Sequence, residues 1–219
     1  MKTLIFDMDG TLLKTMAMWD NFLDGYQNFD ESKIDPNFIP NRTHSSSLVF
    51  TVEMVKDYLK EILDDKTIAQ KVHFFLSDFY STGNRAKENV VETIKKFYSQ
   101  GHKIYLATAT DYHYAKLGLE AAGLLPYFEE LFTPDTVLAK KHDQLYYERI
   151  EAKVSASPET IFYFDDAAYA IEHANKQNWH TIGVYDDEIK NPEESKEVAD
   201  YFIYNFKEIE AILNENEKE

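Results

Sequence analysis

Asp7 and Asp9 follow directly on the apolar run Thr3–Phe6. A strand of this composition is expected to be buried, and buried carboxylates are costly unless something compensates their charge. A bare Asp-Gly pair, such as Asp9 with Gly10, most often makes only a turn. Here the strand end, the second acid and the nearby Thr11 favour a functional site, because ligands of open α/β sheets bind beyond the carboxyl ends of the strands.

Polar side chains follow two further apolar runs in the same way. Thr108 follows Ile104–Ala107, and the adjacent acids Asp165 and Asp166 follow Ile161–Phe164. The chain contains no cysteine, so a metal must be held by oxygen or imidazole ligands. Mg²⁺ prefers hard oxygen ligands in octahedral geometry, and a cation shared with the first carboxylates would explain adjacent acids at the end of an apolar strand.

Short β-rich runs alternate with helical patterns along the chain, which is typical of βαβ units around a parallel sheet. The expected strands are Thr3–Phe6, Ile104–Ala107, Leu131–Thr133, Thr160–Phe164, Thr181–Tyr185 and an edge strand, Tyr201–Tyr204. Helices are expected over 88–100, between Asp111 and Gly123, from about Asp143, from about Ala168 and after Asn205. We therefore predict an α/β fold with a three-layer, Rossmann-like core around a parallel sheet.

The stretch between Thr11 and Glu88 is far longer than the roughly 2–6 loop residues of an ordinary βα connection. Three apolar stripes at helical spacing lie within it. They are Met16, Trp19, Leu23 and Tyr26; Val52, Val55, Leu59 and Ile62; and Ile68, Val72, Phe75 and Phe79. We predict a helical cap domain over residues 15–82, inserted after the first strand, and a catalytic core formed by residues 1–14 and 83–219. The aromatic segment His73–Tyr80 is expected to form core between the cap helices.

Acidic residues outnumber basic ones in this chain. The 39 Asp and Glu against 23 Lys and Arg give a formal net charge of −16, which repels nucleic acid and anionic membrane surfaces. The first apolar run meets Asp7 too early for a signal peptide, and no stretch approaches the ~20 apolar residues of a membrane span. We expect no nucleic-acid or membrane partner and a cytoplasmic location. The sequence leaves open whether the protein is a monomer or a homodimer.

In combination, these residues resemble the haloacid-dehalogenase-like phosphohydrolase superfamily, and within it the β-phosphoglucomutase-like group with a helical cap. The matching residues are Asp7–Thr11 for the first motif, Thr108 for the second, Lys141 for the third and Asp165-Asp166 for the fourth. The resemblance covers nearly the whole chain. Its specificity lies in the combination, because Thr108 or Lys141 alone would carry no such information.

The resemblance implies roles for the acids. Asp7 would attack phosphorus and form an aspartyl phosphate, and Asp9 would act first as general acid and then as general base. Mg²⁺ would be bound by Asp7, by Asp9 through its main-chain carbonyl, and by Asp166. Asp165 would be an additional or outer ligand of the same ion.

The resemblance also implies a phosphate-binding set. Thr108, Ala109 and Lys141 would bind the phosphoryl group of the substrate, and Thr108 and Lys141 would serve catalysis as well. The family commonly has proline after this lysine and the present chain does not, so the choice between Lys140 and Lys141 stays open. We favour Lys141, because Tyr147 then falls where the family places an aromatic residue.

These observations predict a Mg²⁺-dependent phosphatase that hydrolyses a small phosphorylated metabolite, such as a sugar phosphate, through an aspartyl phosphate. A phosphomutase of the β-phosphoglucomutase type is the nearest alternative, although this chain has Trp19 where that group has a histidine. A non-catalytic phosphate-binding protein on the same scaffold is a less favoured alternative. The second acid, Asp9, argues against dehalogenase and phosphonatase chemistry.

The cap offers several residues that could contact the substrate, whose identity the sequence does not give. Arg42 and His44 could reach over the site, although an ordinary loop role is the simpler expectation for both. Trp19 and Met16 could line the substrate pocket, although packing within the cap is favoured for residues on an apolar stripe.

Overall fold

The computed structural model describes residues 1–39, 47–59 and 64–215. In this part of the chain six parallel strands form one sheet in the order β3-β2-β1-β4-β5-β6. They are β1 (Thr3–Phe6), β2 (Lys103–Ala107), β3 (Glu130–Phe132), β4 (Ile161–Asp165), β5 (His180–Val184) and β6 (Tyr201–Ile203). The predicted parallel sheet is confirmed, with strand ends displaced by one residue at most.

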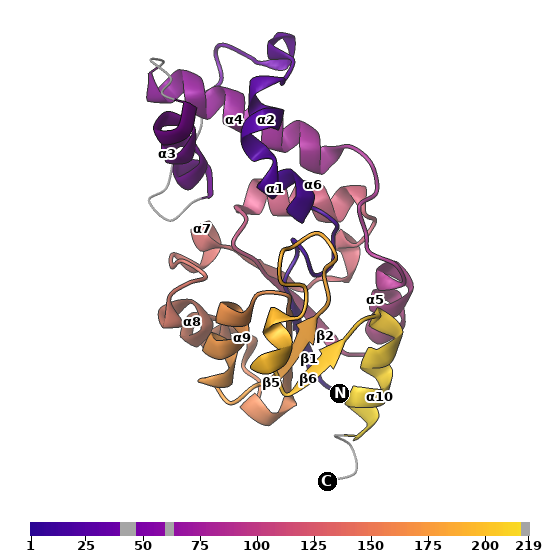
Figure 1. The fold of residues 1–219 in the computed structure, drawn as a ribbon. Helices are drawn as coiled ribbons and strands as arrows, with labels where there is room; N and C mark the ends of the chain where they lie inside the picture. Colours follow the sequence, from indigo (N-terminus) through magenta and orange to yellow (C-terminus); the bar gives the residue numbers. More distant parts are fainter. Residues whose placement is uncertain (40–46, 60–63, 216–219) are drawn as a thin grey trace.

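Helices cover both faces of the sheet, because successive residues of a buried strand point to opposite faces. In β1, Leu4 and Phe6 belong to one buried cluster and Ile5 to another. The first cluster includes residues of α5 (Val90–Ser99), α6 (Tyr112–Ala121) and α10 (Ile209–Glu215), and the second residues of α7 (Pro134–Val137), α8 (Gln144–Val154) and α9 (Ala168–Asn175). Figure 1 shows α8 and α9 on one side of the sheet and α5 and α10 on the other, which confirms the three-layer core.

The predicted helix starts at Asp111, Asp143 and Asn205 are confirmed, because each of these residues is an N-cap. Asn205 accepts a hydrogen bond from Lys207 N and forms a capping box, which starts the turn η5 (Phe206–Glu208) that leads into α10. The Asp111 side chain makes no cap hydrogen bond to α6. Its carboxylate instead accepts from the backbone N of Leu48 at 3.2 Å, which ties the inserted segment to the core.

The insertion between β1 and β2 forms a helical cap. Figure 1 shows α1 (Met16–Asp20), α2 (Phe22–Gln27), α3 (Ser47–Leu59) and α4 (Asp65–Ser81) grouped away from the sheet, before the chain returns to it through α5. The first apolar stripe, at one continuous helical spacing in the sequence, is divided between α1 and α2 at Asn21. The Asn21 side chain donates to Ala17 O at 2.7 Å, and such local bonds compete with helix continuation. Ile62, Arg42 and His44 lie outside the described residues.

The segment His73–Tyr80 does more than fill the space between cap helices, which corrects the sequence-based expectation. It belongs to α4, which packs along α6 of the core as well as against α3. His73 Nδ1 and Tyr114 OH of α6 lie 3.1 Å apart. A Cβ placed on Gly118 of α6 would lie 3.1 Å from Tyr80 Cδ1, so the absence of a side chain there allows close approach. The aromatic segment therefore joins the cap to the core.

The remaining described segments are short. They include the turns η1 (Glu31–Lys33), η2 (Leu125–Tyr127), η3 (Pro158–Thr160) and η4 (Glu194–Glu197). Over the residues that the structure describes, no helix is both long enough and apolar enough to cross a membrane.

Replacement of a core aromatic tests the central packing. Phe164 of β4 stacks on Phe6 of β1 with 4.3 Å between ring centroids, and both are fully buried. We expect Phe164→Ala to lower the free energy of unfolding by about 3–5 kcal/mol, because it removes apolar contacts and leaves a cavity. Urea denaturation measures the change. Phe50→Ala is the control, since Phe50 is 63% exposed, and equal losses in the two variants would contradict this packing.

Candidate active site

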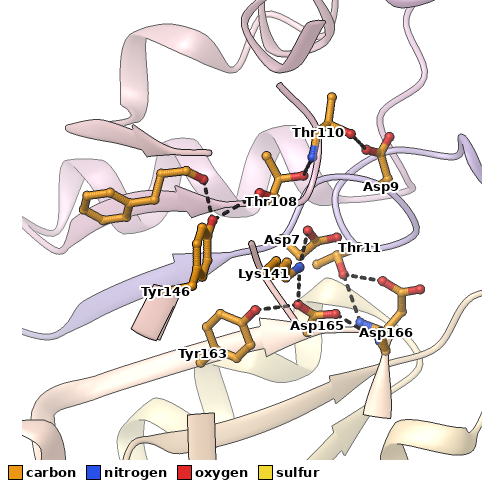
Figure 2. Close-up of polar contacts among 12 residues, drawn as sticks. Asp7, Asp9, Thr11, Thr108, Thr110, Lys141, Tyr146, Tyr163, Asp165 and Asp166 are labelled. Carbon is orange, nitrogen blue, oxygen red and sulfur yellow. Dashed lines mark hydrogen bonds and ion pairs between the residues drawn. The ribbon is translucent and has the colours of Figure 1, made fainter. Parts of the chain in front are cut away.

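The carboxyl ends of β1, β2 and β4 meet because β1 lies between the other two strands. Asp7 follows β1, Thr108 follows β2, and Asp165 and Asp166 lie at the end of β4. Asp7 N donates to Phe164 O at 2.9 Å, so strand pairing continues to the first acid. Figure 2 shows these side chains gathered at one edge of the sheet. The connection from β1 to β2 passes through α5 on one face of the sheet, and the connection from β3 to β4 passes through α8 on the other. Open α/β sheets form a crevice where the strand order reverses in this way.

A cluster of three buried carboxylates is the main feature of this edge. Asp7, Asp165 and Asp166 each offer an oxygen, and these oxygens lie within 4.8 Å of one another. Within the described ranges, no other group of three acids or histidines converges in this way. The donors are all hard oxygens, which fit Mg²⁺. The carboxylate of Asp9, whose main-chain carbonyl is the expected ligand, is not part of the cluster.

Lys141 is the cation that the structure places among these acids. Its Nζ lies 2.6 Å from Asp7 Oδ1 and 2.6 Å from Asp165 Oδ2. The Lys141 side chain is 3% exposed, whereas Lys140 is exposed to solvent, so the structure brings Lys141 and not its neighbour to the site. Burial by itself would lower the pKa of Lys141, but the carboxylates of Asp165 and Asp7 raise it well above its usual value. The ammonium therefore stays charged.

Asp166 is held by the loop that follows β1. Thr11 Oγ1 donates to Asp166 Oδ1 at 3.0 Å and accepts from Asp166 N at 3.1 Å. Gly10 has a φ of +80°, and a Cβ there would lie 2.5 Å from Asp166 Oδ2, so this position needs glycine both for its backbone conformation and for space. Burial, together with the nearby Asp165 carboxylate, raises the pKa of Asp166 to about 7. A proton or a cation is needed to stabilise this carboxyl group.

Asp165 is oriented by two donors besides Lys141. Tyr163 OH donates to its Oδ2 at 2.6 Å, and Ala167 N donates to its Oδ1 at 3.0 Å. The side chain is 1% exposed. These contacts fix the position of Asp165 beside Lys141 and Tyr163 (Figure 2) and next to the start of α9.

The carboxylate of Asp9 accepts hydrogen bonds from three hydroxyl groups. Thr15 and Tyr80 donate to Oδ1 at 2.7 and 2.8 Å, and Thr110 donates to Oδ2 at 2.6 Å. Burial raises the pKa of Asp9, although the bonds from Thr110, Thr15 and Tyr80 oppose the shift. A carboxyl group with a raised pKa can both give and take a proton, which is what acid–base catalysis requires.

Thr108 is fixed by backbone and side-chain contacts. Its Oγ1 accepts from Thr110 N at 3.2 Å, and its carbonyl accepts from Tyr146 OH at 3.1 Å. Because Oγ1 accepts in the first of these bonds, the Thr108 hydroxyl keeps its own hydrogen for another acceptor. Ala109, also expected to bind substrate, follows Thr108 and is exposed.

Trp19 and Met16, the cap candidates, lie near the same edge in α1. Trp19 is partly buried; its Nε1 donates to Tyr80 OH at 3.2 Å, and its ring stacks on Phe22 with centroids 5.8 Å apart. Met16 is partly exposed. The indole therefore packs within the cap, as the apolar stripe predicts, and also contacts a side chain that reaches Asp9.

Sequence reasoning assigned no role to several residues that contact the acids. They are Thr11, Thr15, Tyr80, Thr110 and Tyr163. Thr11 is itself part of the first motif and Thr110 stands two residues after Thr108, and these places in the sequence were the available signal for them. Tyr80 carried no signal beyond its place in an aromatic helix, because its contact with Asp9 spans 71 residues of chain.

A family model described as haloacid dehalogenase-like hydrolase matches residues 4–184. The pyrophosphatase PpaX of Listeria welshimeri is 24% identical over 222 aligned residues, covering 98% of this chain and 97% of that protein. The pyrimidine 5′-nucleotidase PynA of Streptococcus pneumoniae is 23% identical over 155 residues, and that match covers 70% of this chain but only 63% of the nucleotidase.

Solved structures share the fold. A predicted phosphoglycolate phosphatase from Haemophilus somnus superimposes with a TM-score of 0.74 at 17% identity, over 97% of both chains. The YfnB protein of Bacillus subtilis, whose structure was solved bound to magnesium, superimposes with a TM-score of 0.67 at 20% identity, over 97% of this chain and 98% of that one. At these identities the likeness concerns the fold.

Removal of the buried ammonium group of Lys141 should destabilise the protein. Lys141→Met leaves Asp7 and Asp165 buried without the ammonium between them, and losing one partner of a buried ion pair costs about 3–5 kcal/mol. Lys140→Met removes the same charge from an exposed position and should change the free energy of unfolding by less than about 0.5 kcal/mol. Urea denaturation in the presence of EDTA measures the change in the free energy of unfolding for both variants. Similar values for both variants would show that Lys141 does not compensate the acids.

Binding of Mg²⁺ should strengthen as the pH rises through about 7, because a cation must displace the proton that the raised pKa keeps on Asp166. In the absence of metal, the contribution of Asp166 to the free energy of unfolding instead decreases as the pH rises. The contribution of this protonated carboxyl is complete below its ordinary pKa of 3.8 and is lost as the pH rises through about 7. Titration calorimetry at about pH 6 and about pH 8, in buffers of different ionisation enthalpy, measures affinity and proton release. Equal affinity at both pH values would contradict the assignment.

Proposed function

This chain belongs to the haloacid dehalogenase-like hydrolase family, and we propose that it is a Mg²⁺-dependent phosphatase that hydrolyses a small phosphorylated metabolite through an aspartyl phosphate on Asp7. One observation carries the proposal, namely the buried cluster of Asp7, Asp165 and Asp166 with Lys141 paired to two of its members. Such a concentration of charge inside a protein is costly, and a site for a cation and an anionic substrate accounts for it.

The cluster fits a magnesium site by its chemistry. Asp7 and Asp166 would hold the ion with the main-chain carbonyl of Asp9, and Asp165 would be a further or outer ligand. A bound Mg²⁺ supplies positive charge that neutralises phosphoryl oxygens and keeps the neighbouring carboxylates ionised. Positive charge is needed at this point, because the chain as a whole has a net charge of −16 and repels anions.

Asp7 would act as the nucleophile in the first half of the reaction. Its carboxylate oxygen attacks phosphorus, the bond from phosphorus to the leaving oxygen breaks, and Asp9 gives its proton to that oxygen. Thr108 would donate its free hydroxyl hydrogen to the phosphoryl group, with the Ala109 segment beside it. Lys141 would stabilise the charge on the transferred group from its position against Asp7.

The second half returns the enzyme to its starting state. A water oxygen attacks the phosphorus of the aspartyl phosphate while Asp9 takes the proton from that water. The bond between phosphorus and the Asp7 oxygen breaks, which releases phosphate and restores the carboxylate. Asp9 ends protonated, ready for the next leaving group, so one side chain serves both steps.

Residues 15–82 would form the cap domain and residues 1–14 and 83–219 the core. The two connections run side by side, since Lys14 N donates to Arg85 O at 2.9 Å and Lys87 N donates to Leu12 O at 2.9 Å. Paired linkers of this kind suit a hinge, and closure of a cap over the site would exclude bulk water during phosphoryl transfer.

Turnover of phosphate esters tests the proposal. With Mg²⁺ the purified protein should release phosphate from an aryl phosphate or from a member of a panel of sugar phosphates, inorganic pyrophosphate and pyrimidine nucleoside 5′-monophosphates. Pyrophosphate and the nucleotides are included because two similar proteins are named a pyrophosphatase and a pyrimidine 5′-nucleotidase. Asp7→Asn should lower kcat by about 10³-fold or more, and EDTA should abolish activity. Asp57→Asn, the same change at an exposed position of α3, is the control.

The products separate this proposal from its alternatives. Incubation with a hexose 1-phosphate gives free phosphate from a phosphatase and an isomeric sugar phosphate from a phosphomutase. Binding of phosphate or Mg²⁺ without turnover of any ester would instead indicate a non-catalytic protein. Inactivity across the whole panel would overturn the proposal.

A further inference from the structure

The three donors to Asp9 come from two parts of the molecule. Thr110 follows β2 of the core, and Thr15 lies at the entrance to the cap, immediately before α1. Tyr80 lies near the end of α4, where the chain leaves the cap. Both segments that connect the cap therefore contribute a hydroxyl to the same oxygen, Asp9 Oδ1. This arrangement makes the orientation of Asp9 depend on where the cap helices lie.

The direction of the Tyr80 hydroxyl is set by Trp19. An indole N–H can only donate, so in the 3.2 Å contact between Trp19 Nε1 and Tyr80 OH the phenol oxygen is the acceptor. The phenol has one hydrogen, which it donates to Asp9 Oδ1 at 2.8 Å. A hydroxyl that accepts a hydrogen bond also donates more strongly. The hydrogen bond from Trp19 to Tyr80 and the hydrogen bond from Tyr80 to Asp9 therefore point the same way, toward the carboxylate.

Packing holds the phenol ring in place. Tyr80 is 1% exposed and lies against α6, where a Cβ on Gly118 would approach its ring to 3.1 Å. Its ring centroid is 6.3 Å from that of Tyr114. A close-packed side chain of this kind changes conformation only with its helix, so the hydroxyl is a rigid donor and not an adaptable surface contact.

We propose that Tyr80 is a positioning residue for Asp9: it aims the acid–base carboxylate toward the oxygen atoms of the substrate, and Trp19 fixes the direction of its hydroxyl. This inference rests on the proposed phosphatase function. The proton that reaches the leaving oxygen is the one on Asp9, and Tyr80 keeps its own proton throughout. A residue of the cap helix α4 thereby becomes part of the acid–base arrangement through its hydrogen bond to Asp9.

Leaving groups of different acidity distinguish this role from simple packing. Alkyl leaving groups need a proton as the ester bond breaks, whereas a nitrophenolate leaves without one. We expect Tyr80→Phe to lower kcat/KM for an alkyl phosphate by about tenfold or more, and for nitrophenyl phosphate by less than about threefold, since general acid catalysis contributes about 10²–10⁴-fold and only its alignment is impaired. The ratio kcat/KM is used because it reports the steps up to the first phosphoryl transfer.

Tyr114→Phe is the matched control. Tyr114 is a buried tyrosine on α6 whose hydroxyl lies 3.1 Å from His73 Nδ1 of α4, so its loss removes a hydroxyl contact at the same helix interface without reaching Asp9. This variant should affect both esters equally. Thermal melting of both variants shows whether loss of the hydroxyl costs the same stability in each.

Two outcomes would overturn the assignment while leaving the phosphatase proposal in place. One is an equal loss on both esters in Tyr80→Phe, and the other is no loss on either. If Tyr80→Phe does not fold, Trp19→Phe takes its place. It should also lose more kcat/KM on the alkyl phosphate than on nitrophenyl phosphate, by a smaller factor than expected for Tyr80→Phe. Equal losses on the two esters in Trp19→Phe would then overturn the assignment. Absence of turnover by the unsubstituted protein on every ester would overturn the proposed function, and this assignment with it.

Discussion

Compensation of buried negative charge is the constraint on which this structure depends. Asp7, Asp165 and Asp166 converge at the end of a parallel sheet where each is at most 6% exposed, and such a group is unstable without positive charge or protons. Lys141 supplies one positive charge, and its two short ion pairs join strands β1 and β4 through the loop that precedes α8. The remaining negative charge suits a divalent cation, which in the proposed mechanism allows the anionic phosphoryl group to approach Asp7.

The sheet positions the three clustered acids, and the inserted cap contributes to the position of Asp9. The sheet brings the strand ends together regardless of what the cap does, because β1 pairs with both β2 and β4. Asp9 differs from the other acids, since two of its three donors, Thr15 and Tyr80, come from the cap connections. Asp7, the proposed nucleophile, is thus positioned by the core, whereas Asp9, the proposed acid–base group, is positioned jointly by core and cap.

Much of the fold and part of the site could be predicted from the sequence. Continuous apolar runs predicted the strands, because strands buried on both faces are apolar throughout and do not alternate with polar residues. Acids at the ends of those runs predicted the carboxylate cluster. The preference for Lys141 over Lys140 agrees with the burial of Lys141 against Asp7 and Asp165, whereas Lys140 is exposed, and the catalytic role of Lys141 stays a prediction. The break at Asn21 and the contacts of Thr15, Tyr80 and Thr110 with Asp9 could not be predicted, since a local side-chain bond and contacts between distant segments decide them.

Detection of the covalent intermediate tests the central claim most directly. Enzyme mixed with substrate and Mg²⁺, quenched in acid within the first turnover and digested for mass spectrometry, should carry one phosphoryl group on the peptide that contains Asp7. Hydroxylamine should remove that group, as expected for an acyl phosphate. A phosphoryl group on another residue, or turnover with no phosphorylated peptide at any quench time, would contradict the account.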